Sequence, residues 1–189
     1  MGIGLTMVIW SAIILFLLIV FGYFIGIYNS FIRLKNDIVK SWANIDVLLK
    51  QRADELPKLI ASVKGYMKHE RGLLEGITHA RTAFLNAKTM DAKAKADNII
   101  SRTLKTLFAV AENYPNLKAN ENFIQLQGRI SGLENEIADR REFYNDSVNT
   151  YNIKTESFPD RFIAGLMRLT KKEMFKVAES EKQDVKVEF

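Results

Sequence analysis

The stretch IGLTMVIWSAIILFLLIVFGYFIGI, residues 3–27, carries no charge and is rich in Ile, Leu, Val and Phe. As an α-helix it would be about 37 Å long, which is enough to cross a hydrocarbon core of about 30 Å with some tilt. Trp10 lies near one end and Tyr23 and Tyr28 near the other, as is typical of aromatic residues at membrane interfaces. The stretch predicts a transmembrane helix, and we expect residues 1–27 to form a membrane anchor.

A cleaved signal peptide is the competing interpretation of this stretch. Signal peptides have a basic start, an apolar segment of about 7–15 residues and a small-x-small cleavage site. Here no basic side chain comes first, the apolar run is longer, and Phe21-Gly22-Tyr23-Phe24 offers no such site. We therefore expect an anchor that is retained.

The start of the chain has no charged side chain: all 27 basic and 22 acidic side chains lie at or after Arg33. Residues 33–50 hold four basic side chains, whereas residues 1–9 hold none. Basic flanks of a transmembrane helix stay in the cytoplasm. The sequence predicts a single-pass protein of the cell membrane, with its N-terminus outside and the remaining chain in the cytoplasm.

After Tyr28 the apolar residues form a stripe with charges between them, which is typical of an amphipathic helix. The stripe begins with Phe31, Leu34, Ile38, Trp42, Ile45 and Leu49. We expect this helix to continue the anchor without a break, to bend or start a new turn at Pro57, and to end near Tyr66. Further helices are predicted over residues 69–88, 91–112 and 120–157.

The expected fold is all-α: one transmembrane helix followed by an elongated antiparallel, up-down four-helix bundle over residues 28–158. No strand-like alternation competes, and short connections imply antiparallel neighbours. The last helix carries apolar residues at nearly heptad spacing, as in a coiled coil: Phe123, Leu126, Ile130, Leu133, Ile137, Tyr144, Val148 and Tyr151. An alternative keeps residues 28–88 as one long kinked helix and leaves three helices.

Several longer stretches carry a family resemblance. They are YNSFIRLK (28–35), WANID (42–46), LPKLI (56–60), VKGY (63–66), AENYPNLKANENF (111–123), FYNDSV (143–148) and SFP (157–159). Through them the chain resembles the LemA family of bacterial membrane proteins over about residues 1–175. The resemblance implies a transmembrane helix, an outward N-terminus and a four-helix bundle. It supplies no activity, cofactor or catalytic residue.

Catalytic and metal-binding patterns do not assemble in this sequence. It has no Cys, and its two His, His69 and His79, lack the Glu-x-x-His pairs of a di-iron bundle. The nearest helical ligand pair is Glu75 with His79, and we expect both His on a solvated face. Neither a Gly-x-Ser-x-Gly elbow nor a phosphate-binding Gly loop is present. We expect no catalytic residue, no metal, no cofactor and no small-molecule substrate.

Two places are candidate surfaces for a protein partner. Arg140 and Arg141 interrupt the apolar stripe of the last helix, and an ion-pair cluster with neighbouring helices is the alternative interpretation. Tyr114 and Pro115 lie in a segment rich in turn-forming residues, where a structured turn capped by Asn120 is the alternative.

Residues 159–189 differ from the bundle and form a separate predicted segment. An amphipathic helix over 158–176 would contact an anionic membrane surface or fold back on the bundle. Its candidate membrane contacts are Arg161, Phe162, Ile163, Leu166, Arg168, Lys171 and Lys172. The charged end, residues 179–189, is predicted to be disordered.

Function is therefore predicted as a membrane-anchored interaction or scaffold protein that is not an enzyme. Its partners would be other membrane proteins or further copies of itself. Nucleic acid is not expected, because basic and acidic side chains alternate throughout. The alternatives are an accessory subunit of a membrane enzyme, for example a protease, and a membrane-remodelling protein.

Overall fold

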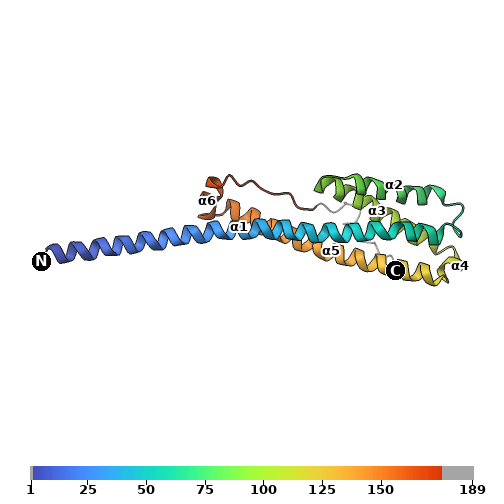
Figure 1. Ribbon diagram of the computed structural model, residues 1–189, viewed down its shortest axis with the longest axis horizontal. Coiled ribbons are helices and arrows are strands. Elements are labelled where there is room, and N and C mark those ends of the chain that lie inside the picture. The colour runs from blue at the N-terminus through green and yellow to red at the C-terminus, as the bar shows by residue number, and fades with distance from the viewer. Residues whose placement is uncertain (1, 176–189) are drawn as a thin grey trace, which may run out of the picture. The chain divides into compact units, whose positions relative to one another are not determined.

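The structure is a computed structural model, and it describes residues 2–175 (Figure 1). These residues contain six helices and no strand, which confirms the predicted all-α class. The helices are α1 (Gly2–Val63), α2 (Arg71–Asn86), α3 (Met90–Ala111), α4 (Pro115–Lys118), α5 (Glu121–Glu156) and α6 (Asp160–Leu166). The disorder predicted for residues 179–189 lies outside the described residues.

Helix α1 contains both the apolar run and the amphipathic stripe that follows it, without an interruption. The large apolar side chains from Leu5 to Ile25 are mostly exposed, and no residue of the most apolar window is buried. Among the described helices, α1 is the one that is long and apolar enough to cross a membrane. Protein packing begins within the last turn of the run, where Ile27 is buried.

Pro57 lies inside α1, and the helix continues through it. Proline has no N–H, so the carbonyl of Ala53 loses the donor that a normal helix would supply. The Nε of Arg81 on α2 donates to that carbonyl at 2.8 Å. This hydrogen bond satisfies the orphaned acceptor and ties α2 to α1, which is a physical reason why no new helix begins there.

The predicted helix boundaries agree with the structure to within a few residues, but one alternative is wrong. Residues 28–88 are not one kinked helix, because α1 ends at Val63 and α2 begins at Arg71. In the connection, the N–H of Met67 donates to the carbonyl of Val63 at 2.9 Å, and the Met67 side chain is buried. The buried methionine holds the chain at the point where it reverses.

Polar side chains cap the starts of two helices, α3 and α5. The Oγ1 of Thr89 accepts from the N–H of Ala92 at 3.2 Å and caps α3. The Oδ1 of Asn120 accepts from the N–H of Phe123 at 3.0 Å and caps α5. The one-turn helix α4 lies where the sequence predicted only a break, and Pro115 occupies its first turn, a position that suits proline.

The chain divides into two units, and the second consists of residues 41–144 with Phe175. Its core takes residues from α1, α2, α3 and α5, with α2 and α3 packed against each other. On α5 the buried residues Phe123, Ile130, Ile137 and Tyr144 recur every seven positions. On α2 the buried residues are Leu74, Ile77, Ala80 and Phe84.

The first unit consists of residues up to Lys40 together with Asn145–Met174. Phe31 of α1 and Tyr151 of α5 are both buried, with ring centroids 6.2 Å apart. The Tyr151 hydroxyl donates to the carbonyl of Thr170 at 3.2 Å. The Asn152 amide accepts from the N–H of Lys172 and donates to its carbonyl, both at 2.9 Å.

Those side-chain contacts explain a correction to the predicted helix over residues 158–176. Helix α6 covers only Asp160–Leu166, and residues 167–175 are not helical. The backbone groups of Thr170 and Lys172 bond to side chains of α5 instead of to a next helical turn. The segment is therefore held against α5 in its own unit.

Candidate functional site: a buried arginine–aspartate cluster

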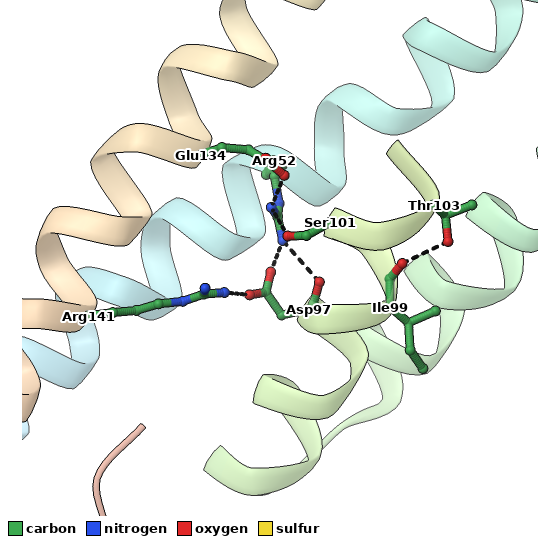
Figure 2. Close-up of polar contacts among 7 residues, drawn as sticks. All are labelled: Arg52, Asp97, Ile99, Ser101, Thr103, Glu134 and Arg141. Atoms are coloured by element: carbon green, nitrogen blue, oxygen red, sulfur yellow. Dashed lines mark hydrogen bonds and ion pairs between the residues drawn. The ribbon is translucent and has the colours of Figure 1, made fainter. Parts of the chain in front are cut away.

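A cluster of charged side chains lies inside the second unit, where α1, α3 and α5 meet. Figure 2 shows Asp97 of α3 between the guanidinium groups of Arg52 on α1 and Arg141 on α5. Asp97 is 1% exposed, and both arginines are buried. Each carboxylate oxygen of Asp97 accepts from a different arginine, so that one carboxylate bridges three helices.

Arg52 makes the largest number of these contacts. Its Nη1 donates to Ser101 Oγ at 2.8 Å and to Glu134 Oε1 at 2.6 Å. Its Nη2 donates to the Asp97 side chain and lies 3.4 Å from the Asp97 carbonyl. The planar guanidinium presents several donors in fixed directions, which lets one side chain bind groups on two other helices.

The charges of the cluster balance, since two arginines face the two carboxylates of Asp97 and Glu134. Removing charges from water costs more than a single pairing returns unless the hydrogen bonds are well formed. Glu134 is partly exposed, whereas Asp97 relies on the arginines and on the protein around it. The cluster therefore stabilises one arrangement of the three helices and penalises any other.

The side chains of the cluster are engaged with one another. Ser101 accepts from Arg52, and an arginine stays protonated, so it cannot act as a general base. Among residues 2–175, no three His, Asp or Glu side chains converge where they could hold a metal ion. His69 and His79 are both exposed. The arrangement can orient helices, because its hydrogen bonds and ion pairs join α1, α3 and α5.

Phe175 closes one side of the cluster. Its ring lies 4.6 Å from the guanidinium carbon of Arg141 and 6.1 Å from the Trp42 ring. The Trp42 ring also packs against Tyr144 at 6.2 Å. A guanidinium over an aromatic face is attracted to it, so Phe175 supports the charge of Arg141 and shields it from water.

An open pocket of the second unit lies away from the cluster. A pocket of about 500 Å³ is lined by Ile60, Lys64, Met67, Lys68, Arg71, Leu74, Glu75 and Thr78. Arg71 and Glu75 in it form an exposed ion pair with each other at 2.8 Å. Its other two cations, Lys64 and Lys68, are exposed lysines without a convergent acceptor or nucleophile among these lining residues.

The two arginines predicted as a partner surface differ from each other. Arg140 is exposed and lies 3.9 Å from Glu136 on the same helix. Arg141 does not lie at the surface, because it is paired with Asp97 inside the unit. An ion pair with a neighbouring helix was the alternative interpretation of this position. Arg141 is thus largely covered by protein, whereas Arg140 remains exposed.

Tyr114 and Pro115 lie at the start of α4. The Tyr114 hydroxyl donates to Glu70 Oε1 at 3.4 Å. Desolvation, and then the negative charge of Glu70, raise the pKa of Tyr114. The Asn120 amide donates to the Tyr66 hydroxyl at 3.2 Å. These bonds join the two connections α1–α2 and α3–α5, which is the structured turn that the sequence suggested, while Pro115 stays exposed.

The residues predicted to contact the membrane differ in their exposure. Ile163 is buried in the first unit, whereas Phe162 and Leu166 are exposed. Arg161, Arg168 and Lys171 are exposed as well, and Lys172 is half-buried beside Tyr151. Lys171 pairs with Glu156 at 2.8 Å.

Sequence reasoning missed Arg52, Asp97 and Glu134. A signal was present, because Arg52 lies three residues after Leu49 and four before Leu56, on the apolar stripe of α1. Asp97 likewise precedes Ile100 by three residues. A charge at a stripe position of one helix is most easily buried when another helix offers the opposite charge at the same level.

Burial raises the pKa of Tyr144 and Tyr151 above that of a free phenol. The folded chain then holds these protons more tightly than the unfolded chain does. We expect the stabilising contribution to be complete below about pH 10 and to be lost as pH rises through the folded pKa. Urea midpoints at about pH 8 and about pH 11 measure the loss, which should be smaller when both tyrosines are replaced by Phe. An equal loss in parent and variant would contradict this assignment.

Comparison with known proteins shows which sequences this chain is similar to. The sequence model of the LemA family matches residues 41–189. The chain is 29% identical over 181 residues to Protein LemA of Metamycoplasma hominis, covering 91% of this chain and 81% of that protein. It is 22% identical over 174 residues to Magnetosome protein MamQ 2 of Paramagnetospirillum magneticum, covering 78% of this chain. It is 20% identical to Magnetosome protein MamQ of Magnetospirillum gryphiswaldense over the same share.

The chain spans 64% of the length of these magnetosome relatives. The family match extends over far more than half of the chain and includes all four charged residues of the cluster, from Arg52 to Arg141. The resemblance in the motifs and the match of the family model agree, and this chain belongs to the LemA family.

Proposed function

We propose that this protein is a membrane-anchored helical scaffold, which displays a rigid bundle to other membrane proteins or to further copies of itself. Two observations carry the proposal. The apolar run of α1 has no protein covering it, while the buried charges of the second unit form ion pairs between its own helices. The uncovered apolar run suits a lipid environment. The buried charges suit a domain whose role depends on holding its helices in one arrangement.

We infer that the second unit is an antiparallel four-helix bundle. Arg52 links α1 to α3 and α5, and Arg81 links α2 to α1. The connections α1–α2 and α2–α3 are short, which favours antiparallel neighbours. The seven-residue spacing of buried residues on α5 supports packing at small crossing angles.

The orientation proposed is N-terminus outside and bundle in the cytoplasm. The chain has no Cys, so a single introduced Cys reports its own position. In intact cells, Gly2→Cys should react with an impermeant maleimide, whereas the exposed Glu136→Cys should react only after permeabilisation. Labelling of Glu136→Cys in intact cells would contradict the proposed orientation, and labelling of neither after permeabilisation would show misfolding.

The scaffold proposal is tested by site-specific photo-crosslinking in cells. A photoreactive residue at Arg140 or Tyr114 should give a discrete adduct, either a dimer of this chain or a complex with one membrane protein. The exposed Lys105 on α3 is the matched control position. Absence of any adduct at Arg140, Tyr114 and other exposed bundle positions would remove the support for a scaffold.

Membrane remodelling is a second candidate. It is favoured by the similarity to proteins named for magnetosomes and by exposed apolar side chains on α6. Purified full-length protein reconstituted into anionic vesicles should then change their shape in electron micrographs. Vesicles that keep the shape of protein-free controls at high protein density would reject it.

A further inference from the structure

The geometry points to α6 as a second membrane contact, which lies in the interface of the leaflet beside the inner end of the transmembrane run. This inference rests on the proposed anchoring of α1. It assigns Phe158, Phe162 and Leu166 to the lipid, and it assigns Ile163 to the protein. The occupant of this apolar face is the bilayer itself, with its anionic headgroups.

Continuity with the transmembrane run is the first argument. The ring of Phe162 lies 6.2 Å from the ring of Phe24, and both belong to the first unit. Phe24 lies within the uncharged run of residues 3–27, three residues before its end. A side chain in contact with Phe24 lies at the depth where the run leaves the hydrocarbon core, so Phe162 is within reach of lipid as soon as α1 is inserted.

The two sides of α6 give the second argument. Ile163 and Ala164 are buried, which fixes the side that faces the protein. Phe162 is 62% exposed and Leu166 is 68% exposed, and their spacing of four places them on one face of the helix. Phe158, just before α6, is 90% exposed. Three large apolar side chains near the end of a membrane-spanning run are typical of an interfacial helix.

Charge gives the third argument. Lys154 pairs with Asp160 at 3.2 Å, which neutralises the acidic residue at the start of α6. Within residues 2–175, neither Arg161 nor Arg168 forms an ion pair, and both are exposed. Basic side chains at this depth are attracted to anionic headgroups, and their aliphatic stems can lie along the apolar boundary.

Arg168 occupies an unusual backbone position. Its φ is 51°, in the left-handed region that favours glycine. The N–H of Leu169 donates to the carbonyl of Ala164 at 2.9 Å, and that of Arg168 to Gly165 at 3.1 Å. These two bonds form a Schellman cap, in which glycine is the common residue at this place. An arginine at this position has a less favourable backbone conformation than a glycine would have. A contact between its side chain and a lipid headgroup would offset that cost.

The test uses the full-length protein reconstituted in vesicles of phosphatidylcholine and phosphatidylglycerol that contain a headgroup-proximal or a deep spin-labelled quencher lipid. An environment-sensitive fluorophore is attached to a single Cys at Phe162, Leu166, Leu17 or Val39. Leu17 reports on the anchor. Val39 is an exposed apolar residue of the same unit, about 18 Å beyond Ile27 along α1.

We expect the headgroup-proximal quencher to reduce fluorescence at Phe162 and Leu166 by about twofold or more, and to leave Val39 little changed. The deep quencher should act on Leu17. If Phe162 and Leu166 behave like Val39 while Leu17 is quenched, the anchor stands and the inference about α6 is overturned. If Leu17 is not quenched, the anchoring in the proposed function fails. A blue-shifted, unquenched probe at Phe162 would indicate a protein partner and overturn the lipid contact.

A charge-altered variant separates headgroup attraction from folding. Arg168→Gly restores the usual residue of the cap, so it removes a charge without endangering α6. Together with Arg161→Gln it should lower quenching at Phe162 in anionic vesicles by roughly half and have no effect in vesicles of phosphatidylcholine alone. The helical signal in circular dichroism should be unchanged. Equal quenching of variant and parent in anionic vesicles would overturn the role of these arginines.

Discussion

Replacing Asp97 by Ala should lower the free energy of unfolding by about 3–5 kcal/mol, because it removes the buried carboxylate that pairs with both Arg52 and Arg141. Asp97 contacts both Arg52 and Arg141 and is almost fully buried. Glu134 cannot replace it, since it contacts Arg52 from another helix and is partly exposed. The cost includes the lost hydrogen bonds and the weaker electrostatic stabilisation of two buried guanidinium groups.

Chemical denaturation of the full-length protein in detergent, followed by circular dichroism, measures this loss. The matched control is Asp54→Ala, which breaks the exposed ion pair between Lys50 and Asp54. That change should cost at most about 0.5 kcal/mol, because an exposed pair on one helix is weak. A loss below about 1 kcal/mol for Asp97→Ala would show that water or another group compensates the arginines.

A second variant distinguishes stability from specificity. Replacing Arg52, Asp97 and Arg141 together by Met, Leu and Met removes all the charges in contact with Asp97 and fills similar volumes. Such replacements of buried ion networks are often neutral or stabilising, by up to about 4 kcal/mol. We expect the triple variant to be far more stable than Asp97→Ala alone. If it is as unstable as the single variant, packing rather than charge balance explains the cluster.

Much of the fold was predictable because local patterns decide it. The uncharged run, the apolar stripes, Thr89 before α3 and Asn120 before α5 each determine a helix or its start through contacts within a few residues. The sequence alone left one long kinked helix over residues 28–88 open, because the burial of Met67 in the connection after Val63 is a tertiary feature that no local pattern reveals. The one-turn helix α4 was too short to give a periodic pattern.

The candidate site was less predictable, because it depends on which residues of different helices meet. Asp97 and Arg52 are 45 positions apart, and their pairing requires the correct rotation of two helices. The sequence singled out Arg141 but not its partner. Phe175 lies in a stretch that the sequence predicted to be helical, whereas in the structure that stretch is not helical and Phe175 contacts Trp42 and Arg141.

Replacing Ile137 by Ala should lower the free energy of unfolding by about 2–5 kcal/mol, and replacing Leu133 by Ala should cost at most about half of that. The sequence treated the two positions alike, since both belong to the apolar stripe of α5. In the structure Ile137 is 1% exposed and lies one heptad after the buried Ile130, whereas Leu133 is only partly covered. Truncation at Ile137 leaves a cavity that the packed helices cannot fill, whereas at Leu133 solvent already reaches the side chain. The exposed Ile124→Ala on the same helix is the control, with a change within about 0.5 kcal/mol. Urea denaturation of the three variants decides the point, because equal losses at Ile137 and Leu133 would mean that α5 is rotated from the face described.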